Sequence, residues 1–231
     1  MSSDQDHLKE TDTEARFEFK KEESSAFETE KGLTEETVRL ISEDKDEPEW
    51  MLERRLRALR QFQEMPMPTD WPGQPDLSEV DIDEIVPYIR PDIETRGGAE
   101  SWEDLPEEIQ DTFDKLGIPE AEKNALSGVG AQYESEIVYQ NMQERWEEKG
   151  VIFCDMDKAV QEHEELVREH FMTKNVPPSD NKFAALHGAV WSGGSFVYVP
   201  EDTTVEMPVQ AYFRMNSEGM GQFEHTLIIA E

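Results

Sequence analysis

The chain has 231 residues and a formal net charge of −32, from 54 acidic and 22 basic residues. This balance argues against nucleic acid as a partner, because phosphates are bound mainly by Lys and Arg, and against anionic membrane surfaces. The acids are spread between apolar runs over most of the chain. This pattern favours the acidic surface of a halophilic protein over a disordered acidic chain or a surface for basic partners.

Targeting signals and disulfides are not expected. The sequence contains no run of about 18 apolar residues, so no membrane-spanning helix is predicted. The first ten residues, MSSDQDHLKE, lack the basic start and apolar segment of a secretory signal. Cys154 is the single cysteine, so no intrachain disulfide can form. A cytoplasmic protein is the expectation.

The first expected element is a disordered acidic leader over residues 1–31, which is polar and has no periodicity. A short helix is predicted over Thr34–Asp44, with Thr34 as its N-cap and two glutamates in its first turn. A second helix follows Pro48, which suits a helix start. Its apolar residues recur at helical spacing: Leu52, Leu56, Leu59 and Phe62.

Four arginines lie on the opposite face of the second helix: Arg54, Arg55, Arg57 and Arg60. Such a positive patch is unusual in so acidic a chain. It is interpreted first as a solvated face paired with nearby acids, and alternatively as a docking face for an acidic partner.

Residues 32–176 are expected to form a mainly helical region with irregular connectors. The further elements predicted there are an irregular Pro/Asp-rich connector over Met65–Asp81, a helix over Ser101–Leu116, a helical turn over Glu120–Leu126, a hinge-like break over Ser127–Ala131, a helix over Gln140–Lys149, a buried strand over Val151–Cys154, and a helix from Asp155 or Asp157 to about Phe171.

Residues 177–231 have a different character, because from Asn181 onward turn signals alternate with short apolar runs as in all-β proteins. Strands are predicted within Ser192–Pro200 and over Val205–Met207, Val209–Phe213 and Phe223–Ala230. Their length and spacing fit a coiled parallel sheet or a small barrel. A solenoid needs several turns to bury a continuous core, so the two or so turns visible here suggest a sequence cut short.

Motifs for common chemistry are missing from the sequence. It has no P-loop pattern, no G-x-S-x-G elbow and no C-x-x-C pair. Cys154 lies in an apolar run and is expected to be an inert core thiol. Two of the five histidines, His163 and His170, are expected to be exposed on one helix.

Two groups of residues are candidates for function. His187, Glu224 and His225 would form a metal triad if the strands brought them together, as in a cupin-like β-barrel metalloprotein. Arg214, in the segment YFRMN, follows a strand of alternating pattern and could point inward, where an arginine needs carboxylate or carbonyl partners. A structural ion pair is the plainer interpretation of Arg214.

Five stretches together resemble one family: EPEWMLERRLRALRQF, GVGAQYESEIVYQN, KGVIFCD, NKFAALHGAVWSGGSFVYVP and QAYFRMNSEGMGQFEHTLIIA. They resemble the SufB branch of the SufB/SufD family of iron–sulfur cluster assembly proteins, in order from about Gly32 onward. The acidic leader and the Pro/Asp-rich connector look like a haloarchaeal version.

The resemblance implies an α+β fold, with an N-terminal helical region followed by the first strands of a right-handed parallel β-helix, incomplete at the C-terminus. It implies a scaffold rather than an enzyme, working with a SufC-type ATPase, a SufD-type paralogue and a sulfur-donor system. Arg214 and Asn216 match the family's YFRxN segment, whose polar side chains would line a path inside the β-helix.

The same resemblance implies an iron–sulfur cluster in the full-length assembly. The cluster-forming and SufC-docking residues of the family lie beyond Glu231, so no stable cluster is expected on this chain alone, and neither a catalytic residue nor a metal ligand is assigned. The alternatives are the cupin-like metalloprotein and a cofactor-free acidic interaction protein.

Overall fold

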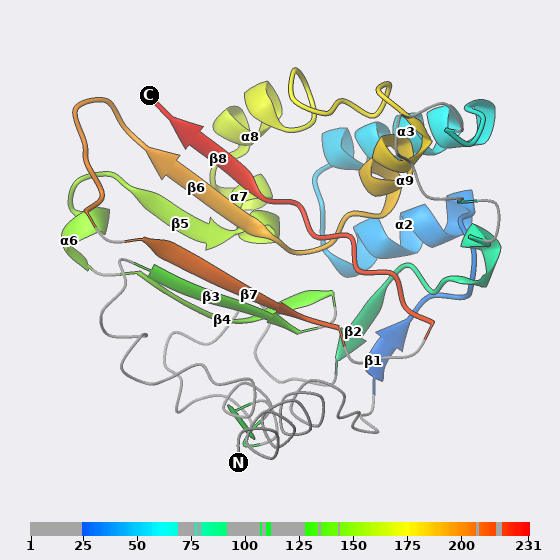
Figure 1. Ribbon diagram of the computed structural model, residues 1–231, viewed down its shortest axis with the longest axis horizontal. Helices are drawn as coiled ribbons and strands as arrows, with labels where there is room; N and C mark the ends of the chain where they lie inside the picture. Colours follow the sequence, from blue (N-terminus) through cyan, green and yellow to red (C-terminus); the bar gives the residue numbers. More distant parts are fainter. Residues whose placement is uncertain are drawn as a thin grey trace, which may run out of the picture.

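The computed structural model of the chain has an α+β architecture (Figure 1). It describes residues 25–68, 77, 80–91, 107, 110–111, 128–133, 135–142, 144–206, 208–215 and 219–231. The predictions over Glu120–Leu126 and most of Ser101–Leu116 lie outside these residues, although Glu107, Gln110 and Asp111 are helical. Within the described residues, no helix has both the length and the apolar character needed to cross a bilayer.

The two N-terminal helices form as predicted. Helix α2 covers Glu35–Asp44 and begins at Thr34, whose hydroxyl accepts a hydrogen bond from the Thr37 N–H at 3.1 Å. Helix α3 covers Glu49–Glu64 and begins after Pro48. Because both starts carry local signals, a cap and a helix-compatible proline, the sequence alone was sufficient to find them.

Helix α9, which covers Lys182–Val190, contradicts the expected all-β character from Asn181 onward. The Asn181 side chain caps it by accepting from the N–H groups of Phe183 and Ala184. The helix packs along α3 (Figure 1). Most of α9 is buried, so it lacks the polar face that gives a helical period, and its apolar residues were included in the region expected to be all-β.

The helix predicted up to Phe171 is two helices. Asp155 caps α7, Met156–Glu162, by accepting from the Asp157 N–H. The chain then bends at His163, and α8 covers Glu164–His170. Val160 and Val167 are buried, and Leu166 is partly buried.

The described residues form three small sheets, and two of these contain strands that the sequence did not predict. In the first, β1 (Ser25–Glu28) pairs antiparallel with β2 (Ile89–Pro91), so residues 25–28 of the expected leader form a strand. In the second, the order is β4-β3-β7. Its strands are β3 (Gly128–Tyr133), β4 (Glu136–Met142) and β7 (Val209–Arg214).

The second sheet, β4-β3-β7, shows that two of the predictions from the sequence are wrong. The expected hinge over Ser127–Ala131 is the start of β3, and the helix expected over Gln140–Lys149 starts within β4. Four residues of that helix remain, as α6 (Glu144–Glu147). A glycine-rich segment such as Gly128–Gly130 looks like a break locally, and its strand character comes from pairing with distant β7.

The third sheet has the order β5-β6-β8, from Ile152–Asp155, Ser195–Val199 and Leu227–Ala230. Strands β6 and β8 are parallel and in register, with Phe196 opposite Leu227, 31 positions apart. Strand β7, which lies between them in sequence, belongs to the other sheet. The chain therefore leaves one sheet, passes through the second and returns to lie beside β6. Val205 and Glu206, in a predicted strand, have no regular structure.

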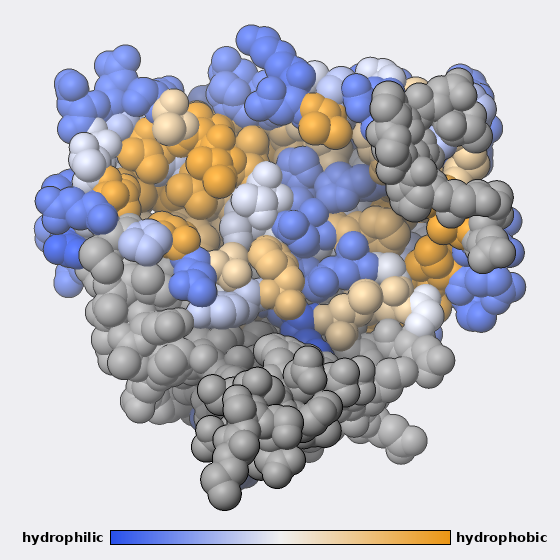
Figure 2. All heavy atoms as spheres, in the orientation of Figure 1, coloured by the Kyte–Doolittle hydropathy of each residue, from blue (hydrophilic) through white to orange (hydrophobic). Residues whose placement is uncertain are grey.

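Two apolar clusters hold these layers together, and α3 contributes to both. One joins α3 through Met51 to the α7–α8 pair and to Phe196 and Ile229 of the third sheet. The other joins α2, α3 and α9 around Ile41, Leu59 and other buried residues. Figure 2 shows further apolar side chains on the surface over the third sheet, bordered by hydrophilic residues. Ile228 of β8 is 67% exposed.

Arg55 of α3 lies between the two clusters and is fully buried. Its guanidinium donates to both carboxylate oxygens of Glu47, at 2.6 and 2.7 Å, and to the carbonyls of Ala189 and Trp191 at 3.1 and 2.9 Å. It also lies over the Trp191 ring. The expectation of a solvated four-arginine face is therefore wrong for Arg55, which bonds the end of α9 to α3.

Replacing Arg55 should destabilise the whole fold. We expect Arg55→Met to lower the free energy of unfolding by about 3–5 kcal/mol, because it leaves the Glu47 carboxylate buried without a partner. Urea denaturation followed by circular dichroism measures this change. Arg60→Ala, an exposed substitution on the same helix, should change stability by less than about 0.5 kcal/mol. Equal effects of the two substitutions would contradict the assigned role of Arg55.

The turn before β6 also constrains the fold. Gly194 has φ +104°, and a Cβ there would collide with the backbone of His225. Gly219 also has positive φ, +75°, but a Cβ there would meet nothing within 4 Å. We expect Gly219→Ala to cost about 1 kcal/mol of stability from backbone strain alone, and Gly194→Ala to cost several times more. Similar denaturation midpoints for the two variants would disprove this close approach.

Candidate functional site

The structure brings together two of the three residues proposed as a metal triad. His187 lies in α9 and His225 lies just before β8, and His187 Nε2 is 2.9 Å from His225 Nδ1. One ring must donate and the other accept, so at least one imidazole is neutral. Aromatic rings surround the pair: Phe171 lies 4.3 Å and Trp191 6.3 Å from the His225 ring, between centroids.

Burial keeps both imidazoles neutral. It lowers the pKa of His187 to about 4, with a further contribution from the Arg55 charge. It lowers the pKa of His225 to about 3, with a further contribution from His187. Both rings are therefore uncharged at neutral pH and form a hydrogen-bonded pair inside an aromatic cluster.

Glu224 does not join this pair. Its carboxylate accepts a hydrogen bond from the Thr226 hydroxyl at 2.9 Å. Among the residues that the structure describes, no three or more His, Cys, Asp or Glu side chains are grouped so that they could hold a metal ion. The two histidines are thus a structural pair in this arrangement, and the proposed triad is not assembled.

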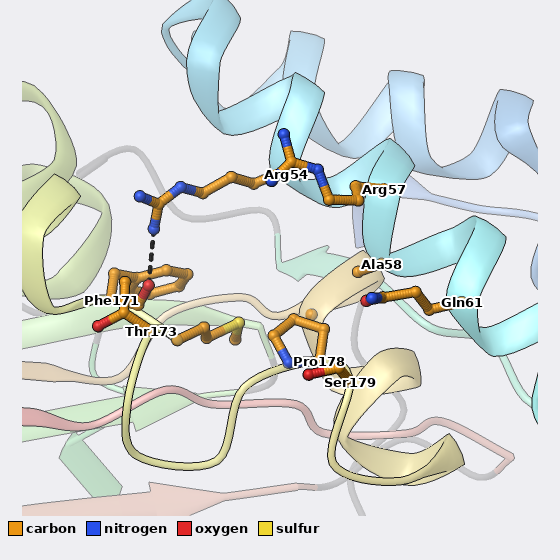
Figure 3. A pocket seen from close by; sticks show the side chains of 10 residues that line it. Arg54, Arg57, Ala58, Gln61, Phe171, Thr173, Pro178 and Ser179 are labelled. Atoms are coloured by element: carbon orange, nitrogen blue, oxygen red, sulfur yellow. Dashed lines mark hydrogen bonds between the residues drawn. The ribbon is translucent and has the colours of Figure 1, made fainter.

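An open pocket of about 240 Å³ lies beside the histidine pair, between α3 and the segment that follows α8 (Figure 3). Phe171 connects the two features, because it lines the pocket and packs on His225. One face of α3 forms the first wall, at i, i+3, i+4 and i+7 spacing: Arg54, Arg57, Ala58 and Gln61. The opposite wall is Phe171, Met172, Thr173, Pro178 and Ser179, with Gly188 of α9.

The remaining arginines of α3 differ in environment. Arg54 is partly buried and donates to the carbonyls of Phe171 and Arg168, at 2.6 and 2.7 Å. Burial lowers its pKa, as do the charges of Arg168 and Arg57. Arg57 and Arg60 are exposed. The sequence found this basic face but could not separate the buried arginine from the pocket-lining ones.

The other sequence candidates are structural or lie apart. Cys154 is buried in β5, and burial raises its pKa to about 12, so its thiol stays protonated. His163 is not on a helix face but at the α7–α8 junction, where its ring stacks on Phe196. His170 is partly exposed in α8.

Arg214, the second kind of candidate, is the last residue of β7 and is partly buried. It aligns with Tyr133 of β3 in the parallel register. Asn216 lies outside the described residues. The residue before Tyr133, Gln132, is fully buried, accepts from the Gly194 N–H at 2.9 Å and lies 3.4 Å from the Ser192 carbonyl. The sequence did not identify Gln132, because its burial depends on the layer formed by the other sheet.

Comparisons with known proteins agree on one family. Residues 103–211 match the family model described as the SufBD protein N-terminal region. The chain is 57% identical over 216 residues to iron–sulfur cluster assembly SufBD family proteins of Staphylococcus haemolyticus and Staphylococcus saprophyticus. It is 56% identical over 216 residues to one of Staphylococcus aureus.

Each of these alignments covers 94% of this chain and 45% of the relative. The chain therefore spans less than half the length of the curated relatives it matches. It is similar in sequence to SufBD family proteins, and residues 103–211 match the model of the family's N-terminal region. The sequence resemblance is confirmed at this level.

The histidine pair predicts a pH dependence of stability. In the unfolded chain both imidazoles should bind protons near pH 6.5, whereas in the folded protein they do so only near pH 4 and 3. The unfolded state therefore binds more protons between these values, and the free energy of unfolding should fall as pH falls from 6.5 toward 4. The slope is at most about 1.4 kcal/mol per pH unit for each histidine.

Urea denaturation at pH 7.0, 6.0 and 5.0 measures this slope. The double variant His187→Gln, His225→Gln should lose most of it, because neither side chain then titrates. His170→Gln, which removes a partly exposed histidine outside the pair, is the matched control. If the double variant kept the full slope, the titrating groups would have to be others.

Proposed function

We propose that this chain is the N-terminal part of a SufB-type scaffold for iron–sulfur cluster assembly. The observation that carries the proposal is 57% identity over 216 residues to iron–sulfur cluster assembly SufBD family proteins. The match of residues 103–211 to the SufBD protein N-terminal region agrees with it. The proposed role is to hold and position cluster precursors in the cytoplasm, without catalytic chemistry of its own.

The strand arrangement supports a right-handed parallel β-helix as the continuing architecture. Strands β6, β7 and β8 follow one another, and β8 returns to lie parallel to β6 and in register with it. Such a return is what a coiled sheet requires of each turn. Strands β3 and β7 are also parallel, as neighbouring strands of such a coil would be, whereas the β3–β4 and β5–β6 pairs are antiparallel.

Arg214 and Asn216 are the residues that we propose line the interior of this coil. The support is that Arg214 ends β7 and is partly buried, and that its neighbour in the sheet lies next to the buried Gln132. Polar groups inside a coil are costly unless they bond one another or a transported species. We infer that sulfur or iron on its way to the assembly site passes these side chains.

In this proposal the iron–sulfur cluster is the product that the scaffold assembles and passes on, and not a resident cofactor of this chain. Cys154 is poorly suited to bind it, because a cluster ligand must be a thiolate and burial raises the pKa of this thiol to about 12. We propose that this chain alone holds no stable cluster, and that it acts with a SufC-type ATPase, a SufD-type paralogue and a sulfur donor.

Affinity purification of this chain, co-expressed with the SufC-type and SufD-type proteins of the same genome, tests the partners. We expect the SufD-type protein to co-purify and the SufC-type protein to join when both partners are present. An Fe–S reporter such as aconitase activity, in a strain lacking this gene, tests the function. Failure of both assays would overturn the proposal.

The role of Arg214 is tested in the same strain. Arg214→Ala should lower reporter activity about tenfold, as for lost groups around metal sites, without loss of the complex. Arg214→Lys should restore part of it, because the charge remains. Arg60→Ala, which removes an exposed arginine, is the matched control. Equal activity of the Ala and wild-type proteins would exclude Arg214 from the proposed path.

A further inference from the structure

The pocket between α3 and the 171–179 segment combines positive charge with concavity in a chain whose net charge is −32. Arg54 and Arg57 line it, and Arg168 lies close enough to lower the Arg54 pKa. Arg168 pairs with Glu164 at 3.0 Å. The positive charge of the pocket therefore comes mainly from the two arginines of α3.

These two arginines are not neutralised by described carboxylates. The described hydrogen bonds of Arg54 go to two backbone carbonyls, which satisfy its N–H groups without cancelling its charge. Within the part of the chain that the structure describes, no ion pair involves Arg57. The nearest acid in sequence to the other wall is Asp180, which accepts from the Asn181 side chain. An unpaired guanidinium at a pocket wall is a ready donor to an anion.

The second wall has an unusual backbone. Met172, which lines the pocket, has φ 49°, a conformation that non-glycine residues rarely adopt, and Val176, in the same segment but outside the lining, has φ 45°. Strain of this kind persists where surrounding contacts fix it, and it gathers at ligand-binding segments. Here Arg54 fixes the start of the segment through the Phe171 carbonyl, as Figure 3 shows.

The lining also has an apolar part. Phe171, Met172, Pro178 and Ala58 contribute carbon surface, and Gln61 and Ser179 contribute side chains that can bond a ligand. At about 240 Å³ the pocket is smaller than the ~300–1,000 Å³ of sites for drug-sized ligands. It suits a small molecule with one anionic group and one short apolar group.

We propose that this pocket binds a small organic anion, with Arg57 and Gln61 contacting a carboxylate or phosphate group and Phe171, Met172 and Pro178 contacting its apolar part. Arg54 positions the second wall and adds long-range attraction. The site is separate from the proposed path past Arg214 and does not depend on the cluster-assembly role.

The test uses the 231-residue chain and three probes: benzoate, phenyl phosphate and neutral benzyl alcohol. Isothermal titration calorimetry gives the affinities. Nitrogen-15 NMR of the five tryptophan indoles gives the location of binding. The Arg54 guanidinium carbon lies 5.1 Å from the centroid of the Trp50 ring, so Trp50 reports on the pocket, whereas Trp146 lies on α6. We expect one anion to bind saturably, at least about tenfold tighter than benzyl alcohol, and to shift Trp50 but not Trp146.

Two variants with the same charge change separate contact from general attraction. Arg57→Gln should weaken anion binding about tenfold, the size of a lost hydrogen bond to a charged group. Arg60→Gln, an exposed residue one turn along α3 that does not line the pocket, should change it less than twofold. Tighter binding of benzoate identifies a carboxylate ligand, and tighter binding of phenyl phosphate identifies a phosphoryl ligand.

Three results would overturn the site. They are equal weakening by the two variants, saturable binding that does not shift Trp50, and no saturable binding of either anion at up to 20 mM. Because Arg57 is exposed, its replacement should leave the urea denaturation midpoint unchanged, and that measurement excludes unfolding as the cause of weaker binding. None of these three results bears on co-purification with partners, so this site and the scaffold role are tested separately.

Discussion

The buried Arg55–Glu47 pair is the interaction on which the remaining arrangement depends. A fully buried guanidinium is costly unless every donor is used, and here its donors reach one carboxylate and two carbonyls at the end of α9. Those carbonyls belong to Ala189 and Trp191, at the point where the chain leaves α9 for β6. The pair therefore fixes where the chain enters β6 relative to α3, and α3 in turn joins the two apolar clusters.

The other ion pairs show how an acidic chain uses its few cations. Lys45 is nearly buried and contacts Asp157 at 2.5 Å, which joins the end of α2 to the start of α7. Arg90 contacts Asp44 at 3.1 Å and joins β2 to α2. Each pair connects segments far apart in sequence. The net charge describes the surface, while the scarce basic residues at these positions hold the layers together. Arg54 also joins distant segments, through the carbonyls of Phe171 and Arg168, but among the described residues neither Arg54 nor Arg57 forms an ion pair with a carboxylate.

Local signals account for what the sequence predicted correctly. Thr34 and Asp155 mark helix starts because their side chains accept hydrogen bonds from backbone N–H groups two or three residues further along the chain. This interaction needs no tertiary context. Long-range contacts account for the errors. Helix α9 has no polar face because it is buried, and β3 is a strand because it pairs with β7 some 80 positions later. The helical spacing of Arg55 placed it on a face expected to be solvated. Its burial depends on α9, which the sequence did not predict.

The candidate residues follow the same division. His187 and His225 were chosen by residue type, but their pairing depends on how the chain returns to β6. That return is fixed outside the strands: the His225 N–H donates to the Gly193 carbonyl at 3.2 Å, and Gly194 leaves room for the His225 backbone. Once these contacts fix the position of His225 beside the turn, Leu227 of β8 lies opposite Phe196 of β6. The histidine pair therefore lies at the point where the register of the two parallel strands is set. Its uncharged state favours this register, because a protonated imidazole there would bring charge into the aromatic cluster beside the turn.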